Sequence, residues 1–178
     1  MSKRVLILSS SPRKGGNSDT LCDRFMQGAK EAHHQVEKVV LAEKKINYCT
    51  GCYGCGGNGE CVQKDDMSQI LDSMAAADVI VLATPVYFYT MCAQMKTVID
   101  RTFARYRKVT NKEFYFIMTA ADNRKAALER TVEGFRAFTS CLPRAKEKGV
   151  VYGTGAWNVG DIFGSRAMDE AYEMGRTV

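Results

Sequence analysis

A loop of small, hydrogen-bonding residues near the N-terminus is the first segment whose residue types suggest ligand binding. Residues 9–18 read Ser-Ser-Ser-Pro-Arg-Lys-Gly-Gly-Asn-Ser and lie between an apolar run and a helix-like pattern. A strand that enters a helix through such a loop leaves backbone N–H groups free at the helix N-terminus, where they bind phosphate. Because no lysine precedes the hydroxyl residue, the loop does not match the one that binds ATP or GTP. An ordinary capped turn is the alternative.

Four cysteines form the second candidate site. Cys49, Cys52, Cys55 and Cys61 are separated by two, two and five residues. The glycines between them allow the chain to wrap tightly with its N–H groups turned toward sulfur, so all four thiols can point to one centre. This spacing is compatible with an iron–sulfur cluster, with a zinc ion, and with free or reversibly oxidised thiols.

A third segment has residues that stack on planar ligands. Pro85 and Val86 follow an aliphatic run and lead into Tyr87, Phe88 and Tyr89. Aromatic side chains in a loop at the edge of a site usually stack on something flat. Their alternative roles are to cover the helix behind them or to form a subunit contact. Together with the loop at residues 9–18, this segment predicts a ligand that has a phosphate and a planar ring.

Alternating strands and helices must position these segments. Apolar runs predict strands at residues 4–9, 36–41, 78–83, 114–119 and 146–152. Apolar residues at spacings of three and four predict helices at residues 18–32, 67–76, 95–106, 128–138 and 165–175. The proline of Thr84-Pro85 is expected to end the third strand. This alternation predicts an α/β fold in three layers, with a doubly wound parallel sheet of five strands between helices.

In a doubly wound sheet, ligands bind beyond the carboxyl ends of the strands. The segments at residues 9–18, 84–91 and 119–124 follow the first, third and fourth predicted strands. We therefore expect these three segments to meet around one ligand.

Composition limits the location and the partners of the chain. Its 178 residues suffice for one domain spanning residues 1–178. The net charge of +5 is modest, and no basic arm is interleaved with aromatics, so nucleic acid is not expected as a partner. No apolar run is long enough to span a bilayer, and no charged-then-apolar leader begins the chain. We expect a cytoplasmic protein that does not bind a membrane.

Three motifs give the chain a resemblance to a known family. Ser-Ser-Pro-Arg-x-Gly-x-Asn-Ser follows the first predicted strand, Thr-Pro-Val-Tyr the third and Thr-Ala-Ala the fourth. Over nearly its whole length the chain resembles the flavodoxin-like NAD(P)H-dependent FMN reductases. The resemblance implies the strand order 2-1-3-4-5 and noncovalent FMN. It implies three sets of cofactor-binding residues: Ser9, Ser11, Arg13, Asn17 and Ser18 for the phosphate, Pro85, Val86, Tyr87 and Phe88 for the isoalloxazine ring, and Thr119, Ala120 and Ala121 for its pyrimidine edge.

The resemblance also implies a reaction. NAD(P)H would supply electrons, and a small acceptor of the quinone, flavin or nitroaromatic class would receive them. Because FMN performs the chemistry, no general base is required, and Tyr87 and Arg124 are the candidates to assist a substrate. Trp157, in a glycine-rich loop after the last predicted strand, either caps the flavin or packs. The resemblance further implies a homodimer or homotetramer.

The cysteine segment is similar to that of the iron–sulfur flavoproteins, a branch of the same family. This similarity implies a [4Fe-4S] cluster on Cys49, Cys52, Cys55 and Cys61. The alternative function is then an electron carrier that receives electrons from a ferredoxin-like donor. A zinc-stabilised binding module without enzymatic activity is the remaining alternative.

Overall fold

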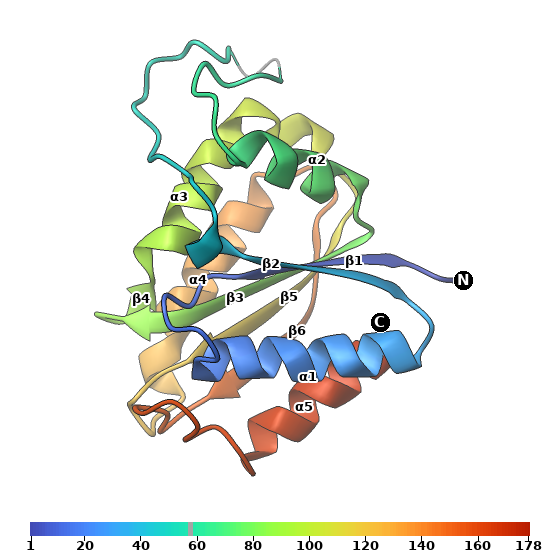
Figure 1. Cartoon of the computed structure of the whole chain (residues 1–178), viewed down its shortest axis with the longest axis vertical. Coiled ribbons are helices and arrows are strands. Elements are labelled where there is room, and N and C mark those ends of the chain that lie inside the picture. The colour runs from blue at the N-terminus through green and yellow to red at the C-terminus, as the bar shows by residue number, and fades with distance from the viewer. Residues whose placement is uncertain (57–58) are drawn as a thin grey trace.

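The computed structural model describes residues 1–56 and 59–178. Gly57 and Asn58, which belong to the cysteine segment, lie outside the described residues. A parallel sheet forms the middle layer (Figure 1). Its strands, in spatial order, are β2 (Gln35–Val40), β1 (Arg4–Ser9), β3 (Val79–Tyr87), β5 (Glu113–Thr119) and β6 (Lys146–Gly153). This is the predicted order of five parallel strands, and a two-residue strand, β4 (Thr90–Met91), is added to it.

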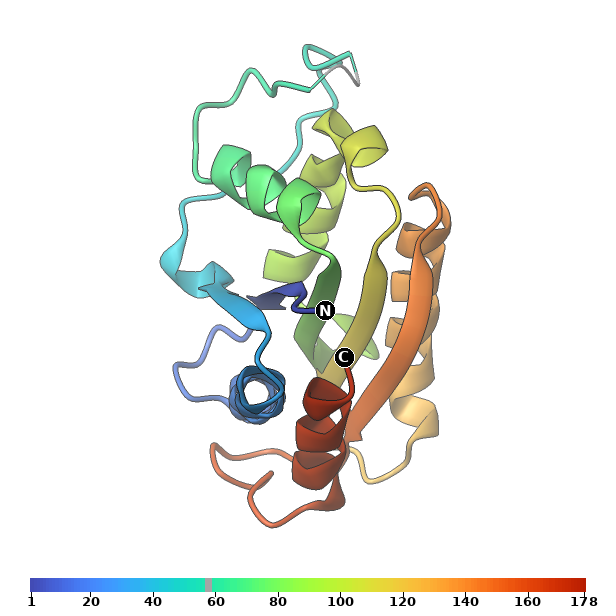
Figure 2. The ribbon, with the colours of Figure 1, turned by 90° about the vertical axis from the view of Figure 1, so that its right-hand side faces the viewer.

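Helices cover both faces of the sheet (Figures 1 and 2). One face carries α1 (Asn17–Glu31) and α5 (Arg166–Arg176). The other carries α2 (Met67–Ala76), α3 (Ala93–Arg101) and α4 (Ala126–Ser140). Alternate residues of each strand point to opposite faces: in β1, Leu6 and Leu8 pack toward α2–α4, whereas Val5 and Ile7 pack toward α1 and α5. The predicted three-layer architecture is confirmed.

Strand β3 continues past Pro85, where the sequence predicted that it would end. Pro85 pairs in register with Thr119 of β5, and the strand then turns back through β4, with Val86 opposite Met91. Proline cannot donate a ladder hydrogen bond. The β1 partner has already ended, because Ser9 pairs with Ala83, so no strand on that side requires an N–H from Pro85.

The predicted helix at residues 95–106 is shorter in the structure. Helix α3 ends at Arg101 and is followed by two short 3₁₀ turns, η2 (Thr102–Ala104) and η3 (Tyr106–Lys108). Phe103, expected on the buried face, is 42% exposed and packs between the rings of Tyr53 and Tyr106. A further 3₁₀ turn, η1 (Leu41–Glu43), follows β2.

Helices α1 and α5 approach one another closely at two glycines. A Cβ atom at Gly28 would lie 2.2 Å from the main-chain oxygen of Tyr172, and one at Gly175 would lie 2.0 Å from that of Phe25. Any side chain at these positions would separate the helices. The structure thus packs the helix that follows the first loop directly against the last helix of the chain. Among the described residues, no helix has the length and hydropathy needed to cross a bilayer.

Candidate functional site

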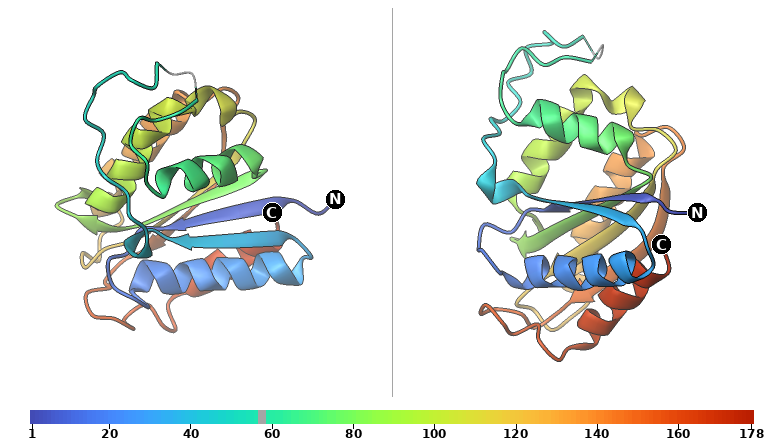
Figure 3. Two further views of the ribbon diagram at one scale, coloured as in Figure 1. Left: turned by 45° about the horizontal axis from the view of Figure 1, so that its top comes forward. Right: turned by 45° about the vertical axis from the view of Figure 1, so that its right-hand side comes forward.

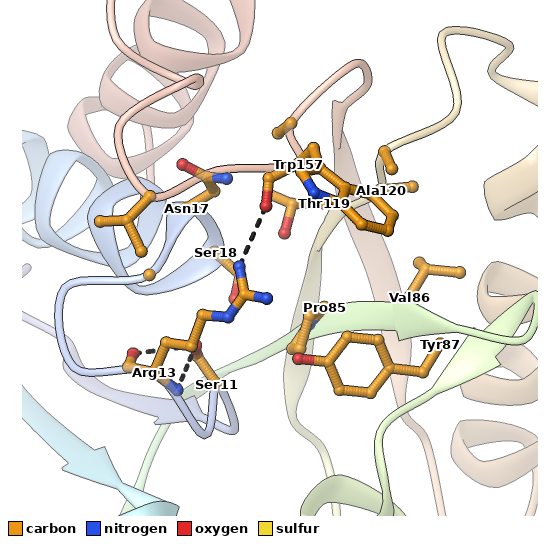
Figure 4. Close-up of a pocket in the computed structure, with 14 residues that line it drawn as sticks. Ser11, Arg13, Asn17, Ser18, Pro85, Val86, Tyr87, Thr119, Ala120 and Trp157 are labelled. Carbon is orange, nitrogen blue, oxygen red and sulfur yellow. Dashed lines mark hydrogen bonds between the residues drawn. The ribbon is translucent and has the colours of Figure 1, made fainter.

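A pocket lies at the carboxyl ends of β1, β3, β5 and β6, where the three predicted segments meet (Figure 4). All but two of the predicted cofactor-binding residues line it, the exceptions being Ser9 and Phe88. Its lining also includes residues from the loop after β6. The full lining is Ser11, Arg13, Gly16, Asn17, Ser18, Pro85, Val86, Tyr87, Thr119, Ala120, Ala121, Ala156, Trp157 and Val159.

The N-terminus of α1 forms one end of this pocket. Ser18 Oγ is buried and has no hydrogen-bond partner among the described residues. Gly16 precedes the helix, and a Cβ there would lie 2.4 Å from Ser11 Oγ. A side chain at position 16 would therefore fill the space between the loop and the first turn of α1. Unpaired N–H groups at a helix start attract anions. The orphaned hydroxyl and this space fit the phosphate of FMN.

The charges around the pocket are also suited to an anion. Arg13 contributes a guanidinium, and no aspartate or glutamate is present among the described residues that line the pocket. Arg13 Nη1 donates to the main-chain oxygen of Trp157 at 3.0 Å, so the guanidinium extends from the loop after β1 to the loop after β6 (Figure 4). An arginine there can form charge-assisted hydrogen bonds with a phosphate.

The opposite end of the pocket is apolar. Pro85 and Val86 lie on β3, and Tyr87 and Trp157 lie on opposite sides of the pocket (Figure 4). Tyr87 is 42% exposed and Trp157 is 70% exposed. A large exposed aromatic surface beside a cavity is typical of a site for a planar ligand.

Ser9 and Phe88 have other positions. Ser9 Oγ donates to Asp19 Oδ1 at 2.7 Å, and Asp19 in turn forms an ion pair with Lys38, so this hydroxyl lies behind the loop. Phe88 is fully exposed at the β3–β4 turn, where Phe88 and Tyr89 both have positive φ. Two-residue hairpin turns with this backbone usually contain glycine or asparagine.

Asn17 binds the loop after β6. Its Nδ2 donates to the oxygen of Asn158 at 2.8 Å, and its Oδ1 accepts from the N–H groups of Gly160 at 3.1 Å and Ile162 at 3.4 Å. Asn17 therefore positions the loop that carries Trp157. The glycine-rich sequence around Trp157 was the one signal for this loop, and no local pattern connects it with Asn17.

The edge of the pocket formed by β5 is held by main-chain hydrogen bonds. Ala120 donates to Gly153 and accepts from Ala156, both at 2.8 Å. Beyond it, Arg124 forms an ion pair with Asp122 at 2.7 Å. Hydrogen bonds from Arg124 lower the pKa of Asp122 to about 2, so this carboxylate is charged at neutral pH and is a weaker proton acceptor than an ordinary aspartate.

The cysteine segment projects beyond the ends of α2 and α3 (Figures 1 and 3). Cys49 and Cys52 are exposed, and Cys55 and Cys61 are half-buried. Within residues 1–56 and 59–178, no three His, Cys, Asp or Glu side chains lie close enough together to hold a metal ion. The backbone N–H of Gly54 and the hydroxyl of Thr50 lower the pKa of the Cys52 thiol. Four thiols in one segment, with the N–H of Gly54 at the Cys52 sulfur, are a donor set whose chemistry fits an iron–sulfur cluster.

Comparison with known proteins identifies relatives of this chain. An iron-sulfur flavoprotein of Archaeoglobus fulgidus is 44% identical over 113 residues, which are 64% of this chain and 51% of that protein. An iron-sulfur flavoprotein of Methanosarcina thermophila is 30% identical over 132 residues, 73% of this chain and 69% of that protein. The chain thus spans about half the length of the first of these relatives.

Solved structures share the fold. The NAD(P)H:quinone oxidoreductase from Methanothermobacter marburgensis superposes with a TM-score of 0.77 at 16% identity, covering 99% of this chain and 97% of that one. An FMN-dependent NADH-azoreductase from Bacillus anthracis, in complex with FMN, has a TM-score of 0.74 at 15% identity, covering 99% of both chains. At these identities the likeness concerns the fold alone.

The family assignment rests on the sequence. The family model described as NADPH-dependent FMN reductase matches residues 3–145, a span that contains the loop at residues 9–18, the aromatic segment and the Thr-Ala-Ala motif. The predicted family and its oxidoreductase class are thereby confirmed. This chain belongs to the NADPH-dependent FMN reductase family.

Proposed function

We propose that the chain binds FMN noncovalently in the pocket at the carboxyl ends of the strands and transfers electrons from NAD(P)H to a small acceptor. The proposal is supported above all by Ser18, whose buried hydroxyl lacks a partner among the described residues in a lining without a described carboxylate. FMN carries an anionic phosphate and a planar ring, and the pocket offers donors at one end and apolar and aromatic surface at the other.

Specific residues have specific tasks in this proposal. Ser11, Ser18 and the first N–H groups of α1 bind the phosphate, and Arg13 pairs with its charge. Pro85, Val86 and Tyr87 support one side of the ring. FMN, when bound, supplies the hydride chemistry. Trp157, on the far side of the pocket, limits access to planar molecules and so favours acceptors of the quinone, flavin or nitroaromatic class.

The experiment uses the fluorescence of Trp157, the sole tryptophan of the chain. Titration of the apoprotein with FMN should quench this emission and saturate at one FMN per chain. Ser18→Ala should weaken binding roughly tenfold to a hundredfold, because a hydrogen bond to a charged group contributes about 1.5–3 kcal/mol. Ser165→Ala is the matched control, since Ser165 Oγ is also buried without a described partner but does not line the pocket. Absence of quenching would refute the proposal.

The electron donor and acceptor are tested separately. Under anaerobic conditions, NADPH or NADH should bleach the visible bands of the bound flavin, and a quinone or nitroaromatic compound should restore them. If neither nicotinamide bleaches the flavin while a reduced ferredoxin-like protein does, the chain is an electron carrier and the reductase proposal fails.

A second candidate function includes a [4Fe-4S] cluster on Cys49, Cys52, Cys55 and Cys61. It is supported by the spacing of these cysteines, by the N–H of Gly54 at the Cys52 sulfur, and by relatives described as iron-sulfur flavoproteins. Anaerobically purified protein should then be brown, with a broad visible absorbance beyond the flavin bands. Cys52→Ala should abolish that absorbance and leave the flavin bands. A colourless, zinc-containing protein would instead indicate a binding module.

We also propose that the chain forms a homodimer or homotetramer. The side chains of Phe88, Tyr89 and Trp157 are half or more exposed, and exposed aromatic groups near a pocket are typical of subunit contacts. Light scattering coupled to gel filtration measures the mass directly. A mass equal to the 19.8 kDa of one chain would contradict this proposal.

A further inference from the structure

Arg101, the last residue of α3, is a deeply buried arginine, with 2% of its surface exposed. Its two terminal nitrogens form a two-pronged ion pair with Asp65, at 2.8 and 2.9 Å. The side chains of this pair are 1% and 4% exposed. A buried ion pair contributes little net stability, and it is costly to break because one charge is then left unpaired. The role of this pair is therefore better sought in the segments that it holds in place than in net stability.

The Arg101–Asp65 pair joins the two flanks of the cysteine segment. On the first flank, the oxygen of Asn47 accepts from Arg101 at 2.7 Å, and the N–H of Asn47 donates to Asp65 at 3.0 Å. On the second flank, the side-chain oxygen of Gln63 accepts from Arg101 at 3.4 Å, and the N–H of Met67 donates to Asp65 at 3.1 Å. One guanidinium and one carboxylate thus fix the chain where it enters and leaves this segment.

One donor of Arg101 remains unused. Its Nε–H is buried and has no partner among the described residues, and Arg101 lines the same cavity as Cys61. A guanidinium is not deprotonated in proteins. The arginine therefore stays charged beside this cysteine.

We propose that Arg101 is the positioning residue of the cysteine segment: it fixes both flanks through Asp65, and its free Nε–H is the donor for the sulfur of Cys61. The effect of Arg101 on a reduction potential rests on the proposed cluster, whereas its positioning role does not. Hydrogen bonds to sulfur and nearby charge tune the reduction potential of such clusters. A buried cation stabilises the more negative, reduced form, so Arg101 raises the potential.

The first experiment concerns the loaded protein. Arg101→Met, Arg101→Lys and the control Arg136→Met are reconstituted anaerobically, and bound iron, sulfide and reduction potential are measured. Arg136 also pairs with a carboxylate, that of Glu147 at 2.7 Å, but at an exposed site. We expect Arg101→Met to lose most of its iron. The clusters that remain bound should have a more negative reduction potential than those of the wild type. Arg101→Lys should retain more iron because it keeps the charge. Wild-type iron content and potential in Arg101→Met would overturn the proposal.

A second measurement does not depend on the cluster. In metal-free protein, hydrogen exchange reports on the N–H groups of Asn47 and Met67, which donate to Asp65. Both should exchange at least tenfold faster in Arg101→Met and at the wild-type rate in Arg136→Met, while FMN still quenches Trp157. If the wild type binds no iron, the cluster proposal fails but this exchange still tests Arg101. Unchanged exchange in Arg101→Met, or in the uncharged Arg101→Gln should the first variant not fold, refutes the positioning role.

Discussion

Asn17 Nδ2 donates a hydrogen bond to the main-chain oxygen of Asn158 at 2.8 Å, across 141 positions of sequence. The loop that carries Trp157 is also held by Asp161, whose carboxylate accepts from the N–H groups of Trp157 and Asn158 at 3.0 and 2.6 Å. The hydrogen bonds that the Asn17 side chain makes with this loop all involve main-chain atoms. The first residue of α1 thereby determines where the aromatic side of the pocket lies.

Replacing Asn17 should loosen this loop. Asn17→Ala removes one donor and leaves the N–H groups of Gly160 and Ile162 without their acceptor, and each lost hydrogen bond is worth about 0.5–1.5 kcal/mol. We expect lower fluorescence anisotropy of Trp157 in the apoprotein. Asn158→Ala, which keeps the main-chain oxygen, should retain the wild-type anisotropy. Equal anisotropy in the wild type and Asn17→Ala would show that Asp161 suffices.

Alanine should have opposite effects at two helical glycines. Gly175→Ala places a Cβ 2.0 Å from the main-chain oxygen of Phe25, so we expect a loss of about 1–3 kcal/mol in the free energy of unfolding. At Gly134 in α4, a Cβ would meet only the terminal methyl group of Met91, at 3.0 Å, and the unbranched methionine side chain can adjust. Gly134→Ala should then gain up to about 1 kcal/mol from helix propensity. Urea unfolding measures both, and a stable Gly175→Ala would contradict the close helix contact.

Acid should remove a contribution of Glu113 to stability. A hydrogen bond from Lys3 at 2.8 Å lowers the pKa of this carboxyl in the folded state. The stabilisation is therefore present above the unfolded pKa of about 4.3 and is lost as pH falls through the lower folded value. In Glu113→Gln, the free energy of unfolding should fall less steeply between about pH 5 and pH 3, by up to about 1 kcal/mol for a partly exposed pair. Glu60→Gln, at an exposed side chain, should keep the wild-type slope.

Thiol labelling should divide the cysteines by burial. Burial raises the pKa of Cys22 to about 12, and Cys92 is buried, with its sulfur 3.2 Å from the oxygen of Ser10. In metal-free native protein, we expect alkylation of Cys49, Cys52 and Cys141, which are exposed, and none of Cys22 or Cys92 until the chain unfolds. Peptide mass spectrometry identifies the labelled positions. Rapid native labelling of Cys92 would mean that its contact with Ser10, in the loop after β1, opens readily.

The sequence predicted the sheet because apolar runs are a local property. Leu6 and Leu8, or Ile80 and Leu82, lie in continuous aliphatic segments that are buried on both faces. The ends of elements were less predictable. Pro85 remains in a strand only because β1 has ended beside it, and that fact depends on the pairing of distant residues.

Among the predicted site residues, too, some positions follow from local sequence and others depend on distant parts of the chain. Ser11, Ser18, Pro85 and Val86 line the pocket, as expected for residues near the carboxyl ends of parallel strands. Asn17 lines it too, but its hydrogen-bonding atoms contact a loop more than 140 positions away. No periodicity or motif reports such a contact, since it depends on two loops that meet only in the folded chain.

The packing of α1 against α5 also affects when the pocket can fold during synthesis of the chain. Residues 17–31 provide the end of the pocket that we propose binds phosphate, yet they are covered by residues 166–176, and Trp157 is synthesised shortly before that helix. During synthesis, a domain cannot complete contacts with residues that have not yet been translated. The pocket can therefore be completed only after residues 157–176 have left the ribosome, so the proposed capture of FMN has to follow their synthesis.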